Sequence, residues 1–104
     1  MLKCTIILPV NYNDGKPITT LTLGYCLDGL LRIAGGYTLL PECIGAYRMD
    51  SGIVCHEPVT PVWVLVESDK LPDIKRWCQH VAETLEQECI YLEICVVDVH
   101  FVRS

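Results

Sequence analysis

The sequence predicts a ferredoxin-like α+β sandwich, folded as one domain over residues 1–104. Three observations predict it. A chain of 104 residues has room for one hydrophobic core. With 51% hydrophobic and 20% charged residues, it is too apolar to be disordered. Its predicted elements follow the order β-α-β-β-β-α-β. We therefore expect an antiparallel sheet with two helices on one face and a β-hairpin inserted before the central strand.

The first half of the pattern is a strand followed by a helix. A strand is predicted over residues 2–10, because apolar residues alternate there with a period of two. A helix is predicted over residues 20–34, with Thr20 as its N-cap. Gly35 ends this helix, since glycine accepts the left-handed conformation that a helix terminus requires. The stripe expected to be buried consists of Leu23, Leu27, Leu30, Leu31 and Ala34.

A hairpin is predicted in the middle of the chain, after a short extended segment at 37–40. Strands at 44–49 and 53–58 flank the loop Asp50-Ser51-Gly52. A three-residue loop that ends in Gly is typical of a type I turn with a bulge. The resulting pairs are Met49 with Ile53, Arg48 with Val54, Tyr47 with Cys55, and Ala46 with His56.

The second half repeats the strand and helix pattern. Residues 60–67 have the strongest strand propensity in the chain. A second helix begins after Asp69, with Pro72 in its first turn, where a missing N–H is harmless. Residues 90–102 are predicted to form a long last strand. The face of the second helix expected to be buried consists of Leu71, Ile74, Cys78, Val81 and Leu85.

The predicted strands are apolar on both faces, which two helices on one side leave unexplained. Antiparallel sheets with a single covered face usually alternate apolar and polar residues. A large exposed apolar sheet face is also rare. We therefore expect this second face to pack against another copy of the chain, in the simplest case as a two-fold dimer. The alternative is that the loop 35–47 folds over this face within one chain.

The charge and the termini exclude several classes of partner. Eight Lys and Arg residues against 13 Asp and Glu residues give a net charge of −5, which disfavours nucleic acid. The N-terminal apolar run is too short for a signal peptide. No stretch approaches the roughly 20 apolar residues of a membrane-spanning helix. We expect a soluble cytoplasmic protein that binds neither nucleic acid nor membrane.

The seven cysteines do not form a recognisable site. None are spaced as C-x-x-C, and no His lies at a zinc-finger offset from a Cys pair. We therefore expect no metal and no cofactor. Most cysteines are expected to be small buried residues in a reducing compartment, with Cys4, Cys78 and Cys95 in apolar patterns.

Two histidines are the candidate acid–base groups. His56 and Glu57 are adjacent on a predicted strand, so their side chains point to opposite faces. Asp98 and His100 share one strand face, about 6.6 Å apart, a spacing at which a carboxylate can orient an imidazole. No phosphate-binding loop or nucleophile motif accompanies them. The sequence therefore names no reaction.

One sequence pattern spans residues 35–57. It consists of Gly35-Gly36-Tyr37-Thr38, Gly45-Ala46-Tyr47 and Gly52-Ile53-Val54, followed by Glu57. The pattern resembles small uncharacterised proteins carried by phages and other mobile elements. The resemblance implies a ferredoxin-like α+β fold with no assigned function. It also implies that Tyr37, Thr38, Tyr47 and Glu57 are positions of interest.

These observations favour a small homo-oligomeric accessory protein without enzymatic activity. It would bind a small ligand or a protein partner through the second sheet face and the 35–47 loop. The candidate ligand-binding residues are Tyr37, Thr38, Tyr47, His56 and Glu57. One alternative is a small enzyme on a dimeric α+β barrel, with His56 or His100 as general base. Another is a purely structural assembly protein.

Overall fold

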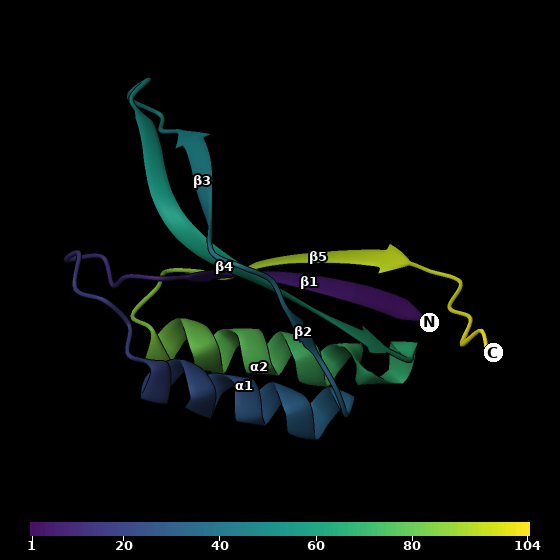
Figure 1. Ribbon diagram of the computed structural model, residues 1–104. Helices are drawn as coiled ribbons and strands as arrows, with labels where there is room; N and C mark the ends of the chain where they lie inside the picture. Colours follow the sequence, from purple (N-terminus) through teal and green to yellow (C-terminus); the bar gives the residue numbers. More distant parts are fainter.

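The computed structural model describes all 104 residues and confirms the predicted fold class and element order. The sheet has the strand order β2-β4-β1-β5, and every pairing is antiparallel. Both helices lie against one face of the sheet (Figure 1). The elements are β1 (Leu2–Pro9), α1 (Thr20–Ala34), β2 (Thr38–Leu39), β3 (Cys43–Arg48), β4 (Val54–Val66), the 3₁₀ turn η1 (Ser68–Lys70), α2 (Leu71–Thr84) and β5 (Tyr91–Val96).

The strands predicted at 53–58 and 60–67 form one continuous strand, the 13-residue β4. Pro58 and Pro61 do not interrupt it, because their carbonyls are used and no N–H is needed from them. The amide of Val10 donates to the Pro58 carbonyl at 3.3 Å, and the amide of Leu40 donates to the Pro61 carbonyl at 2.9 Å. As a result β4 extends well beyond the part that pairs with β1.

The first half of β4 pairs with β3 to form a hairpin that projects from the sheet, away from the helices (Figure 1). We call β3 and residues 49–58 the arm. The predicted pairing is confirmed, with Arg48 opposite Val54 and Tyr47 opposite Cys55. Gly52 has a φ of 89°, which is the left-handed conformation that this turn requires.

The core lies between the sheet and the helices and contains 14 buried residues in one cluster. In α1 the predicted buried stripe left out Cys26, which is buried, and included Leu31, which is exposed. In α2 the prediction missed Trp77, whose indole N–H donates to the Cys26 carbonyl at 2.8 Å. The cluster consists of Cys4, Ile6, Leu8, Cys26, Leu27, Leu30, Val62, Val64, Val66, Ile74, Trp77, Cys78, Val81 and Leu85.

Both predicted N-caps were wrong. The N-cap of α1 is Thr19 rather than Thr20, since the Thr19 hydroxyl accepts the amide of Thr22 at 3.2 Å. Asp69 lies within η1 and does not cap α2, which follows the 3₁₀ turn without a side-chain cap. Gly35 ends α1 in the left-handed conformation, as predicted.

The last strand is shorter than predicted and ends at Val96 rather than at residue 102. β5 pairs only with β1, and this pairing runs from Ile7–Tyr91 to Leu2–Val96. The amide of Val97 still donates to the Met1 carbonyl at 3.0 Å. Residues 97–104, which we call the C-terminal segment, have no strand partner in the chain.

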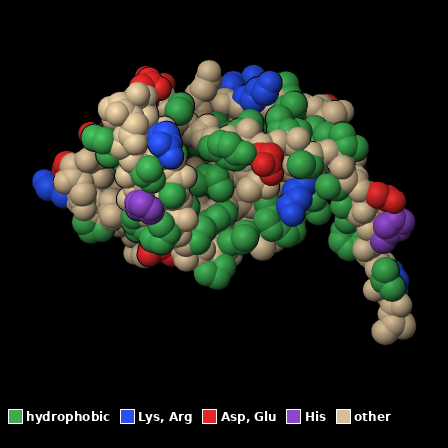
Figure 2. All heavy atoms as spheres, turned by 90° about the horizontal axis from the view of Figure 1, so that it is seen from above, with side chains coloured by type: hydrophobic (Ala, Val, Ile, Leu, Met, Phe, Trp, Pro, Cys, Tyr) green, Lys and Arg blue, Asp and Glu red, His purple; other side chains and the backbone are tan.

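The sheet face opposite the helices, which we call the open face, is not covered by other parts of the chain. The alternative that residues 35–47 fold over it is wrong, because β2 and β3 join the edge of the sheet instead. Figure 2 looks down on this side, where apolar side chains run across the middle. The alternating side chains of β1, β4 and β5 on this face are Lys3, Thr5, Ile7, Pro61, Trp63, Leu65, Tyr91, Glu93 and Cys95. Neither helix has the length and apolar character to cross a bilayer.

The expectation that most cysteines are buried was wrong. Only Cys4, Cys26 and Cys78 are buried, and Cys95 is exposed on the open face. Burial raises the pKa of the Cys78 thiol to about 11, and the neighbouring Cys4 adds to this effect. All seven thiols are free.

We predict that the three buried thiols do not react in the folded protein. A thiol reacts as its thiolate, and burial of Cys4, Cys26 and Cys78 opposes ionisation. Titration with a chromogenic disulfide should modify at most four of the seven thiols in native buffer and all seven in guanidinium chloride. Modification of five or more in native buffer would contradict this placement of the core.

Candidate functional site

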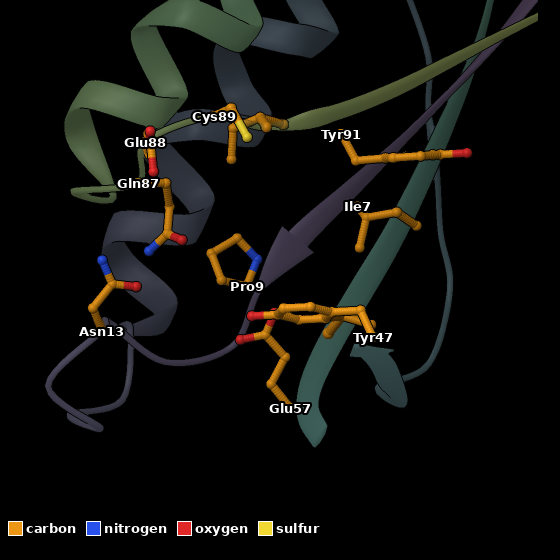
Figure 3. Close-up of a pocket in the computed structure, with 11 residues that line it drawn as sticks. Ile7, Pro9, Asn13, Tyr47, Glu57, Gln87, Glu88, Cys89 and Tyr91 are labelled. Atoms are coloured by element: carbon orange, nitrogen blue, oxygen red, sulfur yellow. The ribbon is translucent and has the colours of Figure 1, made fainter. Parts of the chain in front are cut away.

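The open face and the base of the arm enclose a groove made of two adjoining hollows. Their volumes are about 470 and 610 Å³. In Figure 3, Tyr47 and Glu57 come from the arm, Ile7 and Pro9 from β1, and Tyr91 from β5. The residues that line both hollows are Ile7, Tyr47, Glu57, Val59 and Tyr91. The groove therefore lies where the arm bends away from the rest of the sheet.

The register of the arm places Tyr47 and Glu57 on the same side. Tyr47 lies opposite Cys55, and Glu57 lies opposite Gly45, so the two are diagonal neighbours on one face of the hairpin. Gly45 has no side chain between them, and a Cβ atom there would lie 3.6 Å from the Val59 side chain. Tyr47 and Glu57 therefore project together over an apolar floor.

The polar groups of the groove are mainly hydroxyls and carboxylates, with the amides of Asn13 and Gln87 at one end. The Tyr91 hydroxyl donates to the Glu93 carboxylate at 3.0 Å, and this bond raises the pKa of Tyr91. The negative charge of Glu57 is the largest cause of a raised pKa at Tyr47, followed by Cys55. Both tyrosines therefore stay protonated at neutral pH. Tyr47 can donate its hydroxyl proton to a ligand, whereas the Tyr91 proton is already donated to Glu93. Neither hollow is lined by Lys or Arg, so the groove is acidic.

The other predicted site residues lie elsewhere. His56 pairs with Ala46 on the opposite face of the arm from Glu57, and it is exposed. Tyr37 and Thr38 line a separate hollow of about 390 Å³ beside Trp63 and Phe101. Thr38 pairs with Trp63 of β4, whereas Tyr47 pairs with Cys55. These two β4 residues are eight positions apart, which places Thr38 and Tyr47 up to about 26 Å from each other. The structure thus brings together Tyr47 and Glu57 and not the remaining three.

The Asp98 and His100 pair is formed, but not on a strand. The His100 Nε2 atom lies 2.9 Å from the Asp98 Oδ2 atom in the C-terminal segment, where both side chains are exposed. No third side chain joins them, and the chain contains no group of three or more His, Cys, Asp or Glu residues arranged to hold a metal ion.

Several groove residues were not among the sequence-predicted site residues. Ile7, Tyr91 and Glu93 come from β1 and β5 and face the groove through the pairing of Ile7 with Tyr91. Asn13 and Gln87 close one end of the first hollow, and the Asn13 side chain donates to the Glu86 carbonyl at 3.1 Å. The available signal was the alternation in the last strand, which puts Tyr91 and Glu93 on the face away from the core.

Comparisons with known proteins match the fold and not the sequence. No protein-family model matches the chain, and no curated protein matches its sequence. Among solved structures, CutA1 from a psychrotrophic Shewanella bacterium has a TM-score of 0.73 at 13% identity, over 96% of this chain and 83% of that one. The divalent cation tolerance protein CutA1 of Thermus thermophilus has a TM-score of 0.71 at 14% identity, over 97% and 88%.

A phage SAM lyase in complex with S-methyl-5'-thioadenosine is also similar. Its TM-score is 0.65 at 15% identity, over 90% of this chain and 79% of that one. These likenesses, together with the topology, define the chain as a small ferredoxin-like α+β protein. At such low identity they show the fold alone.

Proposed function

We propose that this chain is a homo-oligomeric binding protein that holds a small ligand in the groove on its open face. The observation that carries the proposal is the meeting of Tyr47 and Glu57 with Ile7 and Tyr91 around one hollow. Ligand sites combine a mainly apolar lining with a few directed polar groups, and this groove has that composition.

The groove chemistry selects the class of ligand. The apolar floor of Ile7 and Val59 and the tyrosine rings favour a planar or apolar body. The carboxylates of Glu57 and Glu93 favour hydrogen-bond donors or positive charge on the ligand. The similarly folded phage SAM lyase holds S-methyl-5'-thioadenosine, which combines a planar base with amine and hydroxyl donors. We therefore choose that molecule as the first probe.

Self-association is the second part of the proposal. The open face and the arm present apolar side chains that water contacts in a single chain, including Ile44, Ile53 and Tyr91. Monomers rarely expose such a surface, and a second copy of the chain would cover it. A two-fold dimer is the simplest form. Seven unpaired cysteines favour a reducing compartment, so we propose the cytoplasm. We also propose that this chain is related to the small proteins of phages and mobile elements that its sequence pattern resembles.

The binding test uses calorimetry with S-methyl-5'-thioadenosine. We expect Tyr47→Ala and Glu57→Gln each to weaken binding about tenfold, since each removes a directed polar contact or a stacking surface. The matched control is Glu83→Gln, the same chemical change at an exposed position of α2. Equal losses in all three variants, or no binding by the unmodified protein, would count against this ligand class.

A small enzyme remains the second candidate, because the Asp98 carboxylate contacts His100 in the way that orients a general base. The same experiment separates the two. Recovery of the probe unchanged after prolonged incubation supports a binding protein. Chemical conversion of the probe, lost in His100→Gln, would support the enzyme instead.

A further inference from the structure

The C-terminal segment has the pattern of a strand but no partner within its own chain. Apolar Val97, Val99 and Phe101 alternate there with polar residues, continuing the alternation of β5. The Phe101 side chain is 84% exposed. An apolar segment with strand periodicity and free backbone groups is suited to pair with another strand.

The arm offers a free edge of matching character. β3 pairs with β4 on one side only, so its outer edge has unpaired N–H and C=O groups. Ile44 on this strand is 66% exposed. A two-stranded hairpin in water is at best marginally stable, and proteins usually cover such an edge. The arm is therefore expected to gain a third strand.

One chain cannot make this contact with itself. The arm begins at one end of β4, whereas the C-terminal segment leaves the sheet at the other end (Figure 1). The 13 residues of β4 span roughly 43 Å when extended. Residues 97–102 reach only about 20 Å. A C-terminal segment that pairs with an arm must therefore pair with the arm of a second copy.

We propose that the C-terminal segment of one copy adds as an antiparallel strand to the outer edge of β3 in another copy. The proposal rests on the self-association proposed above and specifies its contact. One register gives complementary pairs along its whole length. It places Asp98 opposite Arg48, Val99 opposite Tyr47, His100 opposite Ala46, Phe101 opposite Gly45, and Val102 opposite Ile44.

This register is favoured by charge and by shape. Asp98 and Arg48 bear opposite charges at directly facing positions, which stabilises an antiparallel pair. Phe101 lies across from Gly45, and an aromatic ring opposite a strand glycine covers the backbone that the glycine leaves bare. Two reciprocal contacts of this kind close a two-fold dimer, and further copies close a ring.

The contact also completes the ligand groove. Residues that face each other in an antiparallel pair share a face, so Val99 and Phe101 join the side of the arm that carries Tyr47. Tyr47 and Gly45 line the groove. Each groove would therefore have one wall from its own chain and one apolar wall from a second copy.

The experiment measures self-association by light scattering and analytical ultracentrifugation. We expect Phe101→Asp to weaken association at least tenfold, because a carboxylate would replace the ring over Gly45. The matched control is Leu21→Asp, since Leu21 on α1 is 85% exposed, against 84% for Phe101. Only the variant at Phe101 should change the solution mass.

A charge exchange tests the register. Arg48→Asp and Asp98→Arg should each weaken association about tenfold, since each places like charges opposite one another. The double variant should recover the wild-type mass. In a two-fold dimer, an equimolar mixture of the two single variants should also recover it, because each mixed pair restores both Asp–Arg contacts. If the wild-type protein associates and the single variants have the same solution mass as the wild type, the arm contact is wrong. That result would leave the proposed function standing. Wild-type protein that is monomeric at high concentration would overturn both.

Discussion

Replacing Trp77 with alanine is expected to lower the free energy of unfolding by about 3–5 kcal/mol. Trp77 is the largest side chain of α2 in the core, and only 5% of it is exposed. Its ring lies against α1 where Gly29 has no side chain, and a Cβ atom at Gly29 would lie 3.4 Å from the indole. The removal of the ring therefore leaves a cavity between the two helices that neither backbone can fill.

A second variant separates packing from hydrogen bonding at this position. The indole N–H donates to the Cys26 carbonyl at 2.8 Å. Trp77→Phe keeps most of the ring volume but loses the donor, so we expect a smaller loss of about 1–2 kcal/mol. Urea denaturation followed by circular dichroism measures both. A stability of Trp77→Ala within about 1 kcal/mol of wild type would show that the helices do not pack through this residue.

The fold was predictable because its signals are local. The turn Asp50-Ser51-Gly52 alone sets the register of the arm, and the pairing of Tyr47 with Cys55 followed from it. The inner stripe of α1 was less predictable. Cys26 is buried and Leu31 is exposed because Trp77 of α2 packs on the Cys26 side of α1. A contact between helices that are far apart in the sequence cannot be read from the apolar periodicity of either one.

The groove was predictable only in the part that one hairpin provides. Tyr47 and Glu57 share a face through local pairing, so a pattern within residues 35–57 includes both. Ile7 and Tyr91 join them because β1 lies between β4 and β5, a pairing that spans most of the chain. Tyr37 and Thr38 belong to the same sequence pattern, yet the length of β4 separates them from Tyr47.

The last strand shows what apolar periodicity does and does not determine. The pattern predicted a strand through residue 102, but the strand ends at Val96, because a strand also needs a neighbour. β1 supplies one as far as Leu2 opposite Val96. Beyond Val96 the alternation continues as far as Phe101, but no strand of the same chain lies beside it. This unpaired segment is the basis of the proposed contact between copies.

A buried charge on the helix side of β4 is expected to prevent folding. Val64 is fully buried, faces the helices and lies opposite Cys4. In Val64→Asp the carboxylate would have no hydrogen-bond donor or counter-charge, a cost of about 4 kcal/mol or more. That is comparable to the total stability of many small domains, about 5–15 kcal/mol. We expect loss of the cooperative unfolding transition in circular dichroism.

The matched control is the same substitution at the neighbouring Leu65, whose side chain lies on the open face. Leu65 is half-buried and points away from the helices, so the carboxylate of Leu65→Asp reaches water in a single chain. This variant should fold cooperatively, with a loss below about 1.5 kcal/mol. An unfolded Leu65→Asp together with a folded Val64→Asp would reverse the assignment of the two sheet faces. Since both faces of the strand are apolar in sequence, this pair of variants distinguishes the face that the helices bury from the face left for a second copy.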